Sequence, residues 1–260
     1  MALKRLLTAA GAPALAVETT LTTPRIRPGG LLAGTVRLWD GRADADIEHL
    51  AVVLRSGEQL EPAPAELHRA QVRGPFTLRR GEEIKLGFQI PVPWETPISV
   101  MGGRRISGLA LGARADITTA TAADHGHTEF VAVEPLPSQL RVLQALMQLG
   151  CQLNAADLMK GRMEGAGQEL PFHQEISFHP SVLHGGIAGQ VRLSWAAGAQ
   201  HLHLTFEAGH RSGRAVSGDA VARFHISHAE ALHTDWPSEI DRWLTLLLTR
   251  GGRGRPDSHR

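Results

Sequence analysis

The residues best able to do chemistry in this sequence are its histidines, which number 14 among 260 residues. His201 and His203 lie two positions apart in an alternating stretch, so both imidazoles are expected on one face of a strand. Such a pair can bind Zn²⁺, but a zinc site needs three or four ligands and no local spacing supplies the others. The alternative is that Leu202, Leu204 and Phe206 face the core while the two histidines face solvent.

Other residues with reactive side chains are less distinctive. His125 and His127 repeat the same spacing in an expected loop, and His225 and His228 lie close together in sequence. Cys151, the single cysteine, is a nucleophile only if a histidine lies beside it in the fold. It follows an apolar helix, where a buried, unreactive thiol is the ordinary expectation. We therefore predict no catalytic, cofactor-binding or metal-binding residue, and leave metal binding by the first histidine pair open.

A glycine-rich stretch, "PRIRPGGLLAGTVRLW" at residues 24–39, raises the question of a phosphate-binding loop. A phosphate loop needs a helix directly after the glycines, whereas Val36 and Leu38 alternate with polar residues as they do in a strand. Pro28 followed by Gly29 is typical of a tight turn. The stretch is thus predicted to be a turn and a strand. No G-x-S-x-G, S-x-x-K or H-E-x-x-H motif occurs, so the sequence indicates no enzyme.

Composition and charge restrict the classes of binding partner and the cellular compartment that the sequence predicts. The chain has 27 basic and 26 acidic residues, so no overall positive field attracts nucleic acid, and four arginines near the end do not change this prediction. A single cysteine excludes an internal disulfide and favours a reducing, cytoplasmic location. No window approaches the roughly 20 apolar residues of a membrane-spanning helix, so no integral membrane segment is expected.

The elements that position these residues are mostly strands in the first half of the chain. Apolar residues alternate with others at residues 84–90, 108–117 and 47–55. Glycine and proline turns separate these short strands, without long helices between them. The pattern predicts antiparallel sheets stacked as a sandwich. The N-terminal residues 3–10 have the i, i+3, i+4, i+7 spacing of a short amphipathic helix.

The pattern becomes helical after residue 134. Ser138 is the expected N-cap, Leu140, Leu143 and Met147 have helical spacing, and Gly150 is the expected stop. Strand alternation returns at residues 172–178, 189–195, 201–208 and 221–227, and a final amphipathic helix is expected at residues 238–250.

This order of elements predicts two domains. We expect an N-terminal β-sandwich at residues 1–134, an interdomain helix and linker at residues 135–163, a C-terminal β-sandwich with a terminal helix at residues 164–250, and a disordered basic tail at residues 251–260. Each half opens with a strand, a Pro/Gly turn and an alternating strand, a weak similarity that favours two domains of related architecture.

Several colinear segments resemble the bacterial sporulation-control protein M family, whose members are arrestin-like. The most specific match is "PWETPIS" at residues 93–99, and further matches are "RPGGLLAGTV" at residues 27–36, residues 114–138, and "LPFHQEISFHPS" at residues 170–181. The resemblance spans roughly residues 3–250. It implies two arrestin-like antiparallel β-sandwich domains, no catalytic machinery, a cytoplasmic location and regulation through other proteins. We interpret "PWETPIS" as scaffold, with Trp94 anchoring it by burial.

The sequence departs from the family pattern in two places. Asp124 is followed by His125 and His127 where the family is usually acidic, and residues 208–211 are Ala-Gly-His-Arg where it tends to have Val-Asp-Arg-Arg. A charge-based function of these two places does not carry over.

The predicted function is that of a non-catalytic, cytoplasmic regulatory or adaptor protein. Edge strands or the groove between sandwiches are the expected binding surfaces for protein partners, and a homodimer stays open. One alternative is a metal-binding protein or metal-dependent hydrolase that uses His201 and His203. Another is a structural or membrane-peripheral protein that uses the N-terminal helix.

Overall fold

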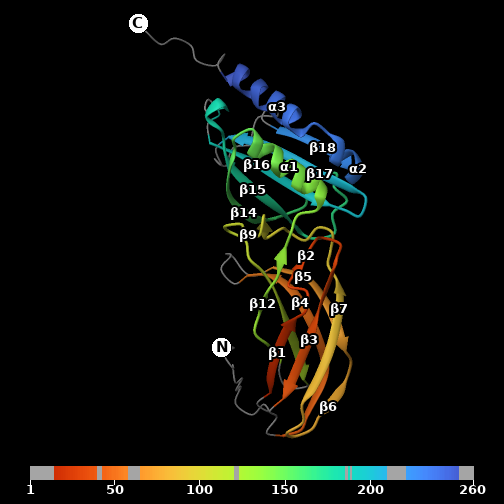
Figure 1. The fold of residues 1–260 in the computed structure, drawn as a ribbon. Helices are drawn as coiled ribbons and strands as arrows, with labels where there is room; N and C mark the ends of the chain where they lie inside the picture. The colour runs from red at the N-terminus through yellow and green to blue at the C-terminus, as the bar shows by residue number, and fades with distance from the viewer. Residues whose placement is uncertain are drawn as a thin grey trace. The chain divides into compact units, whose positions relative to one another are not determined.

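The computed structural model describes residues 15–39, 43–57, 65–119, 123–184, 187, 189–209 and 221–251 (Figure 1). The chain divides into two compact units, here called unit 1 (residues 1–105 and 109–134) and unit 2 (residues 106–108 and 135–260). Antiparallel strands dominate both units, which confirms the predicted all-β class. The helix predicted at residues 3–10 lies outside the described residues, as does the basic tail after residue 251.

Unit 1 contains two main antiparallel sheets. The first has the order β1 (Ala16–Leu21), β3 (Leu31–Trp39), β7 (Ile84–Pro91). The second has the order β11 (Ala123–His125), β10 (Leu111–Thr119), β4 (Ala45–Ser56), β5 (Glu66–Arg73), with β6 (Phe76–Leu78) on β4 and β12 (Glu129–Phe130) on β10. Two short pairs complete the described strands: β2 (Arg25–Ile26) with β13 (Ala132–Val133), and β8 (Val100–Met101) with β9 (Arg104–Arg105).

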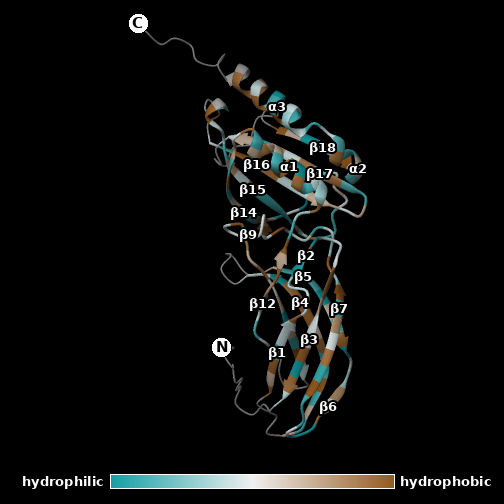
Figure 2. Ribbon diagram, in the orientation of Figure 1, coloured by the Kyte–Doolittle hydropathy of each residue, from teal (hydrophilic) through white to brown (hydrophobic). Residues whose placement is uncertain are grey.

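The two main sheets stack as the predicted sandwich. Leu32, Val36 and Leu38 on β3 are fully buried, and Figure 2 shows the alternation of apolar and polar residues along β3 and β7. The hydroxyl of Thr19 on β1 accepts a hydrogen bond from the backbone N–H of Ala115 on β10 (3.1 Å), which joins the first sheet to the second. Both groups are buried, so this bond satisfies a backbone donor inside the sandwich.

The "RPGG" and "PWETPIS" segments meet at the start of β3. Gly29 has φ = +74° in the predicted turn, and Gly30 N–H donates to the carbonyl of Arg27 (3.0 Å). A Cβ atom at Gly29 would lie 2.5 Å from the Trp94 ring, so only glycine leaves room for that indole. Trp94 remains 37% exposed, so burial of this anchor is less complete than predicted. Ser99 is fully buried, and its hydroxyl accepts from Val133 N–H (3.0 Å), as the scaffold interpretation expects.

Unit 2 contains one five-stranded antiparallel sheet. Its order is β14 (Gln152–Lys160), β15 (Phe172–His179), β16 (Gln190–Ala197), β17 (His201–Gly209), β18 (Val221–Ser227). The helical elements are α1 (Pro137–Gln148), α2 (His228–His233), α3 (Trp236–Gly251) and a 3₁₀ turn, η1 (Val182–His184). The segment expected as interdomain helix and linker, residues 135–163, therefore supplies both α1 and the edge strand β14.

Helices form the second layer of unit 2 in the described residues, where the sequence suggested a second sheet (Figure 1). Phe206 on β17 packs 5.7 Å, between ring centroids, from Trp243 of α3. Phe224 on β18 lies 5.3 Å from Trp236 at the start of α3, in an edge-to-face arrangement. The apolar stripes of α1 and α3 thus cover one face of the sheet. This packing removes the apolar side chains of that face from water. Met147, expected on the stripe of α1, is 41% exposed.

The two ends of α1 differ in how well the sequence predicted them. The N-cap is Leu136, whose backbone N–H donates to the Gln139 side chain (2.9 Å), so the prediction of Ser138 as N-cap is wrong. Gly150 ends the helix as predicted, with φ = +78°. Gly150 N–H donates to the carbonyl of Met147, and the next N–H, that of Cys151, donates to the carbonyl four residues before Gly150. This is a Schellman motif, which needs glycine in the left-handed conformation.

Replacing Gly150 by alanine is expected to lower the free energy of unfolding by about 1–2 kcal/mol. The left-handed φ disfavours a Cβ atom there, and that atom would lie 3.0 Å from the Cβ of Ser181. Urea denaturation followed by circular dichroism measures the change. Gly198→Ala is the matched control in unit 2, because a Cβ atom there has no neighbour nearer than 3.7 Å. Equal stabilities of the two variants would contradict this account of the helix end.

Candidate functional site

Cys151 does not have the surroundings of a nucleophile. The side chain is buried directly after α1, and burial raises the pKa of the thiol, partly offset by a hydrogen bond from the backbone of Ser181. Since the thiolate is the reactive form, a raised pKa disfavours nucleophilic chemistry. The structure supports the expected role of a buried structural thiol.

A chain of hydrogen bonds in unit 2 has the residue types of a serine–histidine–aspartate triad. The Ser181 hydroxyl lies 3.0 Å from His184 Nδ1, and His184 Nε2 lies 3.0 Å from Asp241 Oδ1. Ser181 is only 6% exposed and is three residues from His184 in the turn that forms η1, so a substrate carbonyl has no open approach to its oxygen. Asp241 belongs to α3, so the chain of bonds holds α3 against η1. We interpret it as structural.

Three histidines gather on the face of the unit 2 sheet opposite the helices. His203 on β17 is paired with His225 on β18, and their rings stack at 4.1 Å between centroids. The His201 ring lies 5.0 Å from the same His225 ring. Leu202 and Leu204 are buried, which confirms the alternative that the leucines face the core while His201 and His203 lie on the other face of the sheet. The third ring comes from the neighbouring strand, which local spacing does not indicate.

The histidine group does not have the arrangement of a metal site. In the part of the chain that the structure describes, no three His, Cys, Asp or Glu side chains are placed to share one ion. Burial lowers the pKa of His203, and the nearby His225 and His201 lower it further. A lowered pKa keeps this imidazole neutral in the stacked group.

Replacing His203 by glutamine is expected to weaken the acid sensitivity of folding. The folded-state pKa of His203 lies below its ordinary value of 6.5, so the unfolded chain binds the proton more readily. The resulting stability is present above pH 6.5 and is lost as the pH falls through the lowered pKa. Melting temperatures from about pH 7.5 to about pH 5 should therefore fall less in His203→Gln than in the wild type. Replacement of the exposed His179 by glutamine is the control, and equal slopes in both variants would refute the assignment.

His225 and His228, which are close together in sequence, separate in the structure. His225 faces away from the helices, whereas His228 at the start of α2 lies 2.8 Å, through Nδ1, from the Ser138 hydroxyl of α1. His228 Nε2 lies 2.9 Å from the carbonyl of Gly198, so it joins α1 and α2 to the connection between β16 and β17. His127 is exposed in the connection after β11, and the side chain of His125 lies outside the described residues.

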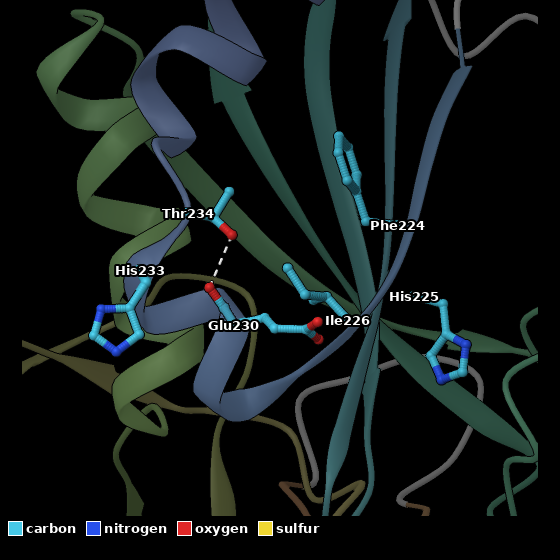
Figure 3. Close-up of a pocket in the computed structure, with 6 residues that line it drawn as sticks. All are labelled: Phe224, His225, Ile226, Glu230, His233 and Thr234. Carbon is cyan, nitrogen blue, oxygen red and sulfur yellow. Dashed lines mark hydrogen bonds between the residues drawn. The ribbon is translucent and has the colours of Figure 1, made fainter.

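A pocket lies along the outer edge of the unit 2 sheet, between β18 and α2 (Figure 3). Its lining residues are Phe224, His225, Ile226, Glu230, His233 and Thr234. Figure 3 shows Ile226 between β18 and Glu230, while His225 points to the side of the strand away from Glu230 and His233. In the described part of the sheet, β18 pairs with β17 alone, so its other side is an open edge.

The pocket carries a fixed negative charge. The backbone N–H and the hydroxyl of Ser227 both donate to the Glu230 carboxylate (3.0 and 2.6 Å), and these bonds lower the pKa of Glu230. Glu230 N–H in turn donates to the Ser227 hydroxyl (3.1 Å), so the pair forms a capping box at the start of α2. The Thr234 hydroxyl donates to the Glu230 carbonyl (2.9 Å) and closes the helix end. The carboxylate is therefore ionised and held by local structure.

No helix among the described residues combines the length and apolar character that a membrane span requires. The two places where the sequence departs from the family pattern are mostly outside the described residues. The side chain of Asp124 and residues 210–211 are not described, and Gly209 ends β17 with φ = +133°.

Comparison with known proteins gives consistent matches over most of the chain. A family model named Spo0M, described as "SpoOM protein", matches residues 3–212. The sporulation-control protein spo0M of Bacillus subtilis (strain 168) is 27% identical over 253 residues, which cover 91% of this chain and 95% of that protein. The crystal structure of Spo0M, sporulation control protein, from Bacillus subtilis aligns with a TM-score of 0.72 and 24% identity, covering 89% of this chain and 98% of that one. The structural match shows a shared fold.

Proposed function

Because this chain belongs to the Spo0M family of sporulation-control proteins, we propose that it is a regulatory protein that acts by binding another protein, without catalysing a reaction. Family membership supports the regulatory role. The protein-binding mechanism has its main support in one observation, the open edge of β18 beside a pocket. An open edge presents backbone N–H and C=O groups that can pair with an extended segment of a partner. A cytoplasmic location is part of the proposal, since the one cysteine is buried and unpaired.

The opposite edge of the same sheet is already partly occupied, because Ala156 N–H of β14 donates to the carbonyl of Ser107 (2.8 Å). β14 ends in Lys160 and has an irregular register between Leu153 and Ala155, and both features discourage pairing with a further strand. β18 pairs with β17 in continuous register from Val221 to Ser227. The regular edge is therefore the better template for a partner strand.

Site-specific photo-crosslinking in the native cell tests the proposed function. A photoreactive amino acid replaces the exposed Arg223 on β18 in one variant and the exposed Gln152 on β14 in the other. We expect a discrete protein adduct from the β18 position that is absent or much weaker from the β14 position. Adducts of equal yield at both edges, or at β14 alone, would overturn the proposal.

The metal-dependent alternative has less support from the geometry. The His203 and His225 rings stack, the His201 ring lies tilted beside that of His225, and no triad of ligands is formed in the described residues. Elemental analysis of untagged protein separates the two functions. Stoichiometric zinc that is lost in His203→Ala would favour the alternative.

A further inference from the structure

We propose that the β18–α2 edge binds an extended protein segment in which an arginine or lysine faces the pocket and its sequence neighbours are acidic. This inference rests on the proposed function, because it specifies the partner of the same edge. It follows from the different charges on the two sides of β18.

Strand pairing places alternate side chains of an added segment on opposite faces. Residues that align with Phe224 and Ile226 face the helix side, where the pocket lies. Residues that align with Arg223 and His225 face the other side of the sheet. Successive side chains of a bound segment therefore contact two different surfaces, the pocket on one face and the Arg223 side on the other.

The pocket side suits a long basic side chain. Phe224 and Ile226 are both half-buried and offer apolar surface to the methylene stem of lysine or arginine. The Phe224 ring makes edge-to-face contacts with the rings of Trp236 (5.3 Å between centroids) and Phe206 (5.8 Å). These contacts hold the Phe224 ring in place. The charged end then reaches Glu230, the one carboxylate in the pocket lining, whose bonds from Ser227 keep it ionised. Charge-assisted hydrogen bonds of this type are stronger than neutral ones.

The opposite side of β18 suits acidic neighbours. Arg223 is exposed and points to the same face as His225. A carboxylate on the added strand next to Arg223 forms a cross-strand pair of opposite charge, whereas a basic residue there is repelled. The alternation acidic–basic–acidic therefore matches β18, and basic–acidic–basic opposes it on both faces.

Synthetic peptides and the full chain test this inference. Fluorescence anisotropy compares Thr-Val-Glu-Arg-Glu-Val-Thr with the same peptide carrying glutamine in place of arginine, and with a charge-reversed peptide carrying Arg-Glu-Arg at its centre. Glu230→Gln removes the charge of the pocket, and glutamine is also accepted in a capping box, so α2 is retained. Glu48→Gln, an exposed change in β4 of unit 1, is the control.

We expect the arginine peptide to bind the wild type and Glu48→Gln equally, and to bind Glu230→Gln about five- to tenfold more weakly. The glutamine peptide should bind the wild type and Glu230→Gln alike. The inference would be overturned if the arginine peptide did not bind. It would also be overturned if neither Glu230→Gln nor glutamine in place of the peptide's arginine changed the affinity. If crosslinking at Arg223 still captures a protein, the proposed function stands. If the photoreactive amino acid at position 223 captures no protein, the proposed function is overturned.

Discussion

Replacing Gly34 by alanine is expected to lower the free energy of unfolding of unit 1 by about 3 kcal/mol. Gly34 lies in the middle of β3, between β1 and β7. An added Cβ atom would lie 2.4 Å from the backbone oxygen of Thr20 and 2.7 Å from the ring of Phe88. The oxygen belongs to the paired strand and cannot move without shifting the β1–β3 ladder, so the whole three-stranded sheet resists the change.

Differential scanning calorimetry of the full chain measures this effect. The transition in which unit 1 unfolds should shift down by roughly 10 °C. Gly87→Ala on the neighbouring strand β7 is the control, because a Cβ atom at Gly87 meets nothing within 4 Å. Gly34→Ala with the stability of Gly87→Ala would show that β1 does not approach β3 as closely as described.

Replacing Trp236 by alanine is expected to lower the free energy of unfolding of unit 2 by about 3–5 kcal/mol. The side chain is fully buried, and its Nε1–H donates to the Ala231 carbonyl at the end of α2 (2.8 Å). It also supports Phe224 of β18 in an edge-to-face contact. The same change should therefore weaken binding at the β18 edge, because the pocket wall loses its support.

Two further variants separate the causes of the Trp236 effect. Trp236→Phe keeps most of the buried ring but loses the hydrogen bond, so about 1–2 kcal/mol should be lost. Trp94→Ala removes an indole of the same size that is 37% exposed, and should cost clearly less than Trp236→Ala. Urea denaturation supplies the three values. A Trp94→Ala effect as large as that of Trp236→Ala would contradict the assignment of Trp236 to the core.

Much of the fold could be predicted because single strands show their periodicity directly. The alternation at residues 84–90 corresponds to β7 at Ile84–Pro91, and that at residues 201–208 to β17 at His201–Gly209. β14 was missed because its residues, "QLNAADLMK", alternate poorly, and the strand forms through its pairing with β15. The helical second layer of unit 2 was also missed. Local periodicity predicts a helix, but tertiary packing determines whether that helix covers a sheet.

The candidate site was predicted less completely, since it combines residues from different elements. The first histidine pair was visible in the sequence, but the stacking with His225 depends on the register between β17 and β18. The Ser227-x-x-Glu230 capping box carries a readable local signal, which indicates where β18 ends and α2 begins. That β18 is a sheet edge is a property of strand order, and no local pattern reports strand order.

The most direct test of binding at β18 is amide hydrogen exchange of the full chain with and without the protein captured by crosslinking. Pairing with an added strand would slow exchange at residues 221–227 of β18, while residues 152–160 of β14 would exchange as before. Unchanged exchange along β18, together with new protection elsewhere in the chain, would contradict the account.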